Sequence, residues 1–206
     1  AYFRLAGHGS SVTGTTSGCA PTALLDAWSP TGPFQRSDLK IRPAVEGDAD
    51  ALASIHVPSW CAAYRGIVPD SVLSGMNETQ RAKQFREAIA VNREETHILE
   101  SAVEARGFLR LGRARDKEQD PGSDGEIWGI YVSSAYWRNG VGTVLLEEAQ
   151  RMLRDRQFRT VYLWVFPENE AARSFYVNAG FEPDGHTKEI PWERPASAMR
   201  LAKPLL

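Results

Sequence analysis

The feature that most constrains the fold is the stretch Ile130–Thr143, in which an apolar run is followed by a short polar loop and two closely spaced glycines. From there apolar residues recur at helical spacing, which predicts a strand, a loop and a helix that opens near Gly142. Glycines let the backbone approach a ligand closely, and the free amides of a first helical turn favour an anion. A pyrophosphate fits such a site.

Taken alone, Gly-x-Gly before a helix is weak, because the same pattern occurs in ordinary tight turns. A nucleotide-binding domain of the Rossmann type is a further reading. Two observations speak against it: the loop lacks Gly-x-Gly-x-x-Gly, and no acidic residue stands at the end of a second parallel strand.

Residues 1–38 differ in composition from the rest, since eighteen of them are Gly, Ser, Thr or Pro. Such a stretch is poor in core-forming side chains, and we expect an N-terminal arm that packs across a partner subunit or a neighbouring molecule. Residues 39–206 carry the regular apolar periodicities of one domain, which is about what a chain of 206 residues allows.

The first half of this domain is expected to contain antiparallel strands and two helices. Leu39–Pro43 reads as a short strand, and Asp48 could cap a helix in which Pro58 is a kink or a stop. A second helix is expected at 79–90. The segments 97–103 and 108–114 read as two strands joined by a tight turn at 104–107.

The second half reads as strand, helix, strand and helix, followed by two strand-like pieces. The expected bounds are 126–132, 142–156, 160–166, 169–179, 181–189 and 198–203. Antiparallel strands followed by a strand–helix–strand crossover predict a mixed α/β sheet flanked by helices.

Composition and charge argue against several classes of partner and site. The net charge of −2 gives no broad reason to expect nucleic acid or an anionic membrane as partner. The longest apolar runs are far shorter than the ~20 residues of a membrane helix. Only two cysteines suit a reducing cytoplasm, and the spacing of histidines and cysteines predicts no metal site.

A second motif, Asn169-Glu-Ala-Ala-Arg-Ser-Phe-Tyr-Val-Asn-Ala-Gly-Phe181, follows the glycine loop. Together the two runs resemble the GNAT superfamily of N-acetyltransferases, and the segment from Trp60 to Asp70 is similar to the first-helix region of a bacterial subgroup. The resemblance implies a mostly antiparallel sheet with a central, splayed parallel strand pair. It also implies acetyl-CoA as cosubstrate, an amine as acceptor and, frequently, a homodimer.

The resemblance also implies the residues that bind the coenzyme. Backbone groups of the strand would pair with the pantetheine arm, and the loop would grip the pyrophosphate. Asn169 would contact the pantetheine or merely cap its helix. Trp137 departs from the family pattern, which has Gln or Arg at this position. The implied coenzyme-binding residues are Ile130, Tyr131, Val132, Arg138, Asn139, Gly140, Val141, Gly142, Thr143 and Asn169.

Two residues are the implied acid and base. Tyr176 would protonate the leaving thiolate, and the alternative is an aromatic on the apolar face of its helix. Glu126 would take the amine proton directly or through water, because an ammonium must lose a proton before it attacks a thioester. For Glu126 the alternative is a solvated carboxylate at a strand start.

The acceptor itself is not readable from the sequence. Trp60, Tyr64 and Arg65 are candidates for the acceptor pocket, although aromatics in a first helix are more often core. Transfer is expected to be direct, since no residue of the motif is an evident covalent nucleophile. The alternative function is a GNAT-like module that binds acyl-CoA without turnover.

Overall fold

The computed structural model describes residues 38–92, 95–102 and 104–205. The predicted N-terminal arm therefore lies outside the described residues, apart from Asp38. None of the helices in the described ranges combines the length and the apolar character that crossing a bilayer requires.

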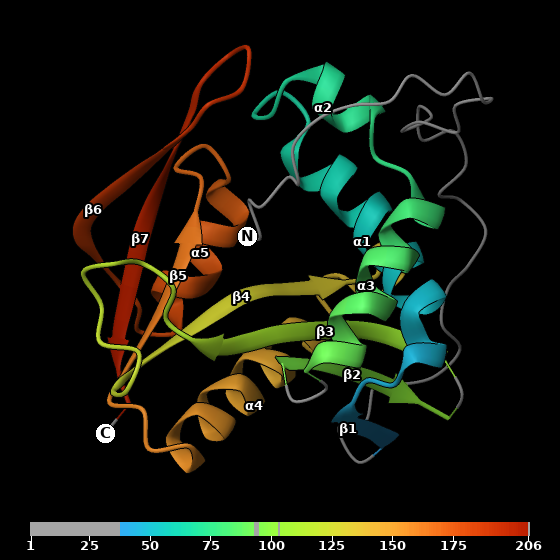
Figure 1. Cartoon of the computed structure of the whole chain (residues 1–206), viewed down its shortest axis with the longest axis horizontal. Helices are drawn as coiled ribbons and strands as arrows, with labels where there is room; N and C mark the ends of the chain where they lie inside the picture. The colour runs from blue at the N-terminus through green and yellow to red at the C-terminus, as the bar shows by residue number, and fades with distance from the viewer. Residues whose placement is uncertain (1–37, 93–94, 103, 206) are drawn as a thin grey trace.

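The core of the molecule is one seven-stranded sheet (Figure 1). Its strand order is β1-β2-β3-β4-β5-β7-β6, and every neighbouring pair is antiparallel except β4 and β5. The predicted mixed, mostly antiparallel sheet is thus confirmed. The strands are β1 Leu39–Pro43, β2 Thr96–Ser101, β3 Glu104–Arg113, β4 Asp124–Val132, β5 Thr160–Val165, β6 Glu182–Ile190 and β7 Ala196–Pro204.

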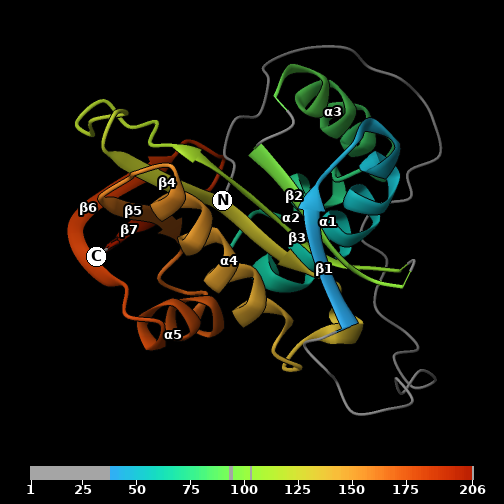
Figure 2. The same cartoon turned by 90° about the horizontal axis from the view of Figure 1, so that it is seen from below.

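Helices cover both faces of the sheet, and each face has its own apolar cluster. One cluster joins the sheet to α1–α3, and the other joins it to α4 and α5. Figure 1 shows α1 and α3 above the sheet and α4 below it, and Figure 2 shows α5 beside α4. The helices are α1 Ala49–Tyr64, α2 Asp70–Ser74, α3 Glu78–Val91, α4 Val141–Asp155 and α5 Glu170–Asn178.

The parallel pair opens into a gap. β4 and β5 pair at only three positions, the last of which is Glu126 with Tyr162. β4 nevertheless continues to Val132 and β5 to Val165, so their later halves diverge. The register between β3 and β4 also shifts here, which leaves Trp128 as the extra residue of a bulge. A bulge bends and twists a strand. This bulge lies at the point where β4 leaves β5.

One local prediction was wrong, and of the kink or stop predicted at Pro58 the stop is excluded. The segment 104–107 is not a turn but the start of β3. Gly107 lets β3 approach the neighbouring strand closely, since a Cβ there would lie 2.7 Å from the Tyr131 carbonyl oxygen. Pro58 does not end the first helix, which runs on to Tyr64. Burial of Trp60 and Cys61 beyond the proline offsets the hydrogen bond that the proline cannot make.

Candidate functional site

The loop between β4 and α4 contains two residues in the left-handed backbone conformation. A single 3₁₀ turn, Ser134–Tyr136, is followed by Arg138 with a φ of 61° and Gly140 with a φ of 79°. Gly140 adopts a positive φ without steric cost because it has no Cβ. In Arg138 the Cβ makes the same conformation unfavourable. α4 then begins at Val141.

The first turn of α4 presents backbone amides that the helix does not use. The first helical hydrogen bond is donated by Val144 to the Gly140 carbonyl, so the amides of residues 141–143 have no acceptor inside the helix. Gly142 sits beside α5, since a Cβ there would lie 3.6 Å from the Phe175 ring. This arrangement is suited to hold an anion such as a pyrophosphate.

Two aromatic residues fix the loop to the sheet. Tyr136 is buried, donates its hydroxyl to Glu104 at 2.6 Å and lies under the guanidinium of Arg106. Trp137 is 44% exposed and donates its indole N–H to the Val132 carbonyl at 2.8 Å. The side chain that departs from the family pattern therefore contacts the end of β4.

The backbone of β4 offers polar groups to the gap. Ser133 donates its amide to the Arg106 carbonyl on β3. Because backbone groups alternate in direction along a strand, those of Tyr131 face β3, and those of Ile130 and Val132 face β5. The pantetheine contact therefore stays a prediction, and the geometry favours Ile130 and Val132 over Tyr131 for it.

Asn169 caps α5. Its side-chain oxygen accepts the Ala172 amide at 3.1 Å, which is the N-cap role that the sequence left open. A contact with pantetheine stays a prediction.

Tyr176 lies on α5, on the face of the sheet that α4 also covers. Its ring packs against Phe175 and Phe181. Burial raises the pKa of Tyr176, and Tyr131 contributes. Burial also raises the pKa of Tyr64, with smaller contributions from Tyr131 and Tyr176. A phenol with a raised pKa keeps its proton at neutral pH, so Tyr176 holds a proton that it could donate.

Glu126 is the last β4 residue that pairs with β5, and it is 2% exposed. The alternative of a solvated carboxylate is therefore wrong. Arg115 donates to it from its backbone N–H and from Nε and Nη2, at 3.2, 3.0 and 2.5 Å. The Arg115 guanidinium also lies over the Trp128 ring, 4.7 Å from its centroid. Glu126, Arg115 and Trp128 thus form one assembly at the root of the gap.

A cavity of about 1060 Å³ adjoins this assembly. Trp128 and Trp164 stand two residues beyond the last β4–β5 pair, on opposite edges of the gap, and both line it. Trp164 and Ile190 belong to the core cluster on the α1–α3 face, so the cavity reaches the gap from the side opposite α4. Further lining residues are Glu95, Arg110, Asp116, Glu126, Lys188 and Glu189.

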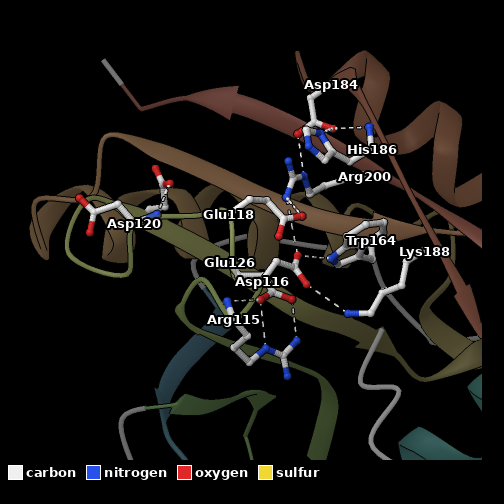
Figure 3. A network of polar contacts seen from close by, with 11 residues as sticks. Arg115, Asp116, Glu118, Asp120, Glu126, Trp164, Asp184, His186, Lys188 and Arg200 are labelled. Atoms are coloured by element: carbon white, nitrogen blue, oxygen red, sulfur yellow. Dashed lines mark hydrogen bonds and ion pairs between the residues drawn. The ribbon is translucent and has the colours of Figure 1, made fainter.

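A polar network holds one wall of the cavity (Figure 3). Asp116, from the loop between β3 and β4, accepts the Trp164 indole N–H at 2.9 Å and the Lys188 ammonium at 3.1 Å. Arg200 on β7 is buried, donates to Asp184 at 2.6 Å and lies 3.8 Å from Asp116. Among the described residues, no group of three or more His, Cys, Asp or Glu is placed to hold a metal ion.

The predicted acceptor residues are not gathered in this cavity. Trp60 is 6% exposed and belongs to the core of α1, where it packs against His56 and Tyr64. Arg65 is exposed at the end of that helix. None of the three lines the cavity, and their contact with an acceptor stays a prediction.

Sequence reasoning missed the residues that do line the cavity. Trp128 had a signal, since it lies next to Gly129 in the middle of the central strand, and a strand glycine often marks a bulge. Arg115 and Asp116 stood in a segment read as a polar loop, with no local pattern to set them apart. Their partners are 11 to 72 residues away in the chain.

Comparisons with known proteins agree with this geometry. Residues 60–181, more than half of the chain, match the acetyltransferase (GNAT) family. The uncharacterized N-acetyltransferase YuaI of Bacillus subtilis is 25% identical over 134 residues, which cover 63% of this chain and 72% of that protein. A probable N-acetyltransferase of Mycobacterium tuberculosis is 26% identical over 156 residues, which cover 73% and 84%.

Solved structures show the same fold. The PaiA N-acetyltransferase of Thermoplasma acidophilum, in complex with coenzyme A, superposes with a TM-score of 0.67 at 19% identity, covering 81% of this chain and 98% of that one. The ribosomal-protein-alanine N-acetyltransferase of Brucella melitensis gives 0.62 at 23% identity, covering 80% and 99%. The chain belongs to the acetyltransferase (GNAT) family.

Proposed function

We propose that this chain transfers the acetyl group of acetyl-CoA directly to a primary amine, with the two substrates entering the β4–β5 gap from opposite faces of the sheet. The observation that carries the proposal is the gap itself. Its α4 side ends at the loop of residues 133–140 and the free amides of α4, and its other side opens into the cavity between Trp128 and Trp164. That a structural neighbour was solved with coenzyme A supports the coenzyme assignment.

The proposed reaction begins with a neutral amine. The ammonium loses a proton to water in the open cavity, and its nitrogen then attacks the thioester carbonyl. A backbone N–H of Ile130 or Val132, both of which face the gap, would stabilise the oxyanion. The C–S bond breaks as the intermediate collapses, and Tyr176 donates its phenolic proton to the thiolate. The proton that the amide nitrogen releases restores Tyr176.

For Glu126 the contacts support a role other than that of the base. Its carboxylate accepts three hydrogen bonds from Arg115, and it would have to give up part of them to accept a substrate proton. We propose that Glu126 instead holds Arg115 against Trp128, the bulged residue at which the gap opens. Glu126 is then a positioning residue of the acceptor side.

The experiment that tests the function is an acceptor screen that reads the free thiol released from acetyl-CoA. Small amines, amino acids, polyamines and peptides with a free N-terminus form the panel. Acceptor-dependent thiol release, with an acetylated product of the expected mass, is the result that we expect. Tight coenzyme A binding without turnover on any acceptor would support the non-catalytic acyl-CoA-binding alternative.

Three further properties complete the proposal. A homodimer and a cytoplasmic location are proposed from the family resemblance. Residues 1–38 are proposed as an arm that packs against the partner subunit and that coenzyme binding does not need. Sedimentation of the full chain and of a chain without residues 1–36 tests the dimer and the arm together.

A further inference from the structure

In the contact between Trp137 and β4, the indole forms a hydrogen bond with a backbone group that faces the gap. The Val132 carbonyl accepts the Trp137 indole N–H at 2.8 Å. The hydroxyl of Ser59 on α1 lies 2.9 Å from the same oxygen and 2.6 Å from the Ile55 carbonyl, and its single proton serves one of the two at a time. The loop, β4 and α1 therefore meet at one carbonyl.

The position of Trp137 makes this contact important for the loop. The next residue, Arg138, has a positive φ, which costs free energy in a residue with a Cβ and persists only where the surroundings hold it. On one side of this strained residue the chain is tied down by Tyr136 and Trp137, and on the other side Gly140 and α4 follow.

We propose that Trp137 is a positioning residue that holds the loop of residues 133–140 ready for the coenzyme by donating its indole N–H to Val132. This rests on the proposed coenzyme site. A loop that is already ordered loses less conformational entropy on binding, so the contact raises affinity without touching the ligand. A second consequence is that the Val132 carbonyl is occupied, which leaves the Val132 amide and the groups of Ile130 for pantetheine.

Trp137→Phe is the test, because it keeps an aromatic ring and removes only the donor. The side chain is 44% exposed, so we expect the variant to fold. Trp192→Phe is the matched control: Trp192 is a half-buried tryptophan that packs against Phe166 in the cluster on the other face. Two measurements are made on each protein: amide hydrogen exchange without ligand, and coenzyme A affinity by calorimetry.

We expect Trp137→Phe to speed exchange in peptides that cover residues 133–143 and to weaken coenzyme A binding about threefold to tenfold, ~0.6 to 1.4 kcal/mol. Trp192→Phe should change neither. Unchanged exchange in the loop overturns the proposal, and if affinity still falls, the indole acts by touching the ligand. Faster exchange with unchanged affinity overturns the link to binding. If the wild-type chain binds no coenzyme A, the proposed function fails, and the exchange result still decides whether Trp137 anchors the loop.

Discussion

The two faces of the sheet are built in different ways. On the α4–α5 face, the proposed coenzyme-binding groups come from contiguous segments: the loop 133–140, the first turn of α4 and the start of α5. On the α1–α3 face, the cavity is assembled from four strands (β3, β4, β5 and β6) and from connecting segments such as the loop between β3 and β4. The hydrogen bonds around the cavity join residues that are far apart in the sequence, such as Asp116 and Trp164, which are 48 residues apart.

We infer from this difference that the coenzyme is recognised mainly by backbone groups and the acceptor mainly by side chains. The coenzyme face offers amides and glycines, which any sequence with the right turns supplies. The acceptor face offers charged and aromatic side chains that can change one at a time without disturbing the loop. We therefore expect substitutions in the loop and the first turn of α4 to change coenzyme affinity, and substitutions in the cavity or at the proposed proton donor to change turnover.

Tyr176→Phe should give the largest effect. It keeps the ring that packs against Phe175 and Phe181, and it removes the proposed proton donor. General acids contribute ~10²-fold or more, so we expect kcat to fall about that much while coenzyme A affinity stays the same. Steady-state kinetics and calorimetry on one preparation check both. A loss under about threefold would indicate that Tyr176 only packs.

Gly142→Glu comes next and should act on the coenzyme alone. A carboxylate at the first turn of α4 would enter the proposed pyrophosphate site and repel it, so affinity should fall at least tenfold, ~1.4 kcal/mol or more. Gly142→Ala is the matched control, because the added Cβ meets Phe175 only at ordinary contact distance. Equal affinity in a folded Glu variant would contradict the coenzyme site.

Glu126→Gln should give a smaller effect, confined to the acceptor. Loss of the charge loosens Arg115, and we expect kcat/KM for the acceptor to fall about threefold to tenfold, ~0.6 to 1.4 kcal/mol, with coenzyme A affinity unchanged. If Glu126 were the base, the rate would rise with pH as its carboxyl lost a proton, and this acidic limb would vanish in the variant. We expect the limb to persist. Its disappearance would restore Glu126 as the base.

Deletion of residues 1–36 should have the smallest effect on binding. The described sheet begins at Leu39, and all the proposed coenzyme-binding residues lie after residue 129. Coenzyme A affinity should therefore match that of the full chain, as calorimetry can measure. Loss of both folding and binding would show that the arm belongs to the core.

The same contrast between contiguous motifs and long-range contacts explains how much of the structure could be predicted from the sequence. The sheet, the glycine loop and the Asn169 cap rest on local periodicity and on contiguous motifs, and these predictions hold in the structure. The bulge at Trp128 lies between β3 and β4 and has only the weak local signal of Gly129, and the cavity depends on how β3, β4, β5 and β6 lie in space, which no local pattern encodes. Gly107 shows the limit: a glycine read as a turn residue is required by the Tyr131 carbonyl of the neighbouring strand.

The position of β7 has a consequence for the order in which the chain can fold. β7 lies between β5 and β6, although both precede it in the sequence. Lys203 near its end also donates to the Ala179 carbonyl of α5 and to Gln150 of α4, both at 2.7 Å. During synthesis, which proceeds from the N-terminus, β6 has no strand to pair with until residues 196–204 have left the ribosome. We therefore expect the helices that carry the proposed coenzyme-binding groups to be fixed last, after α1–α3 and β1–β4 have assembled.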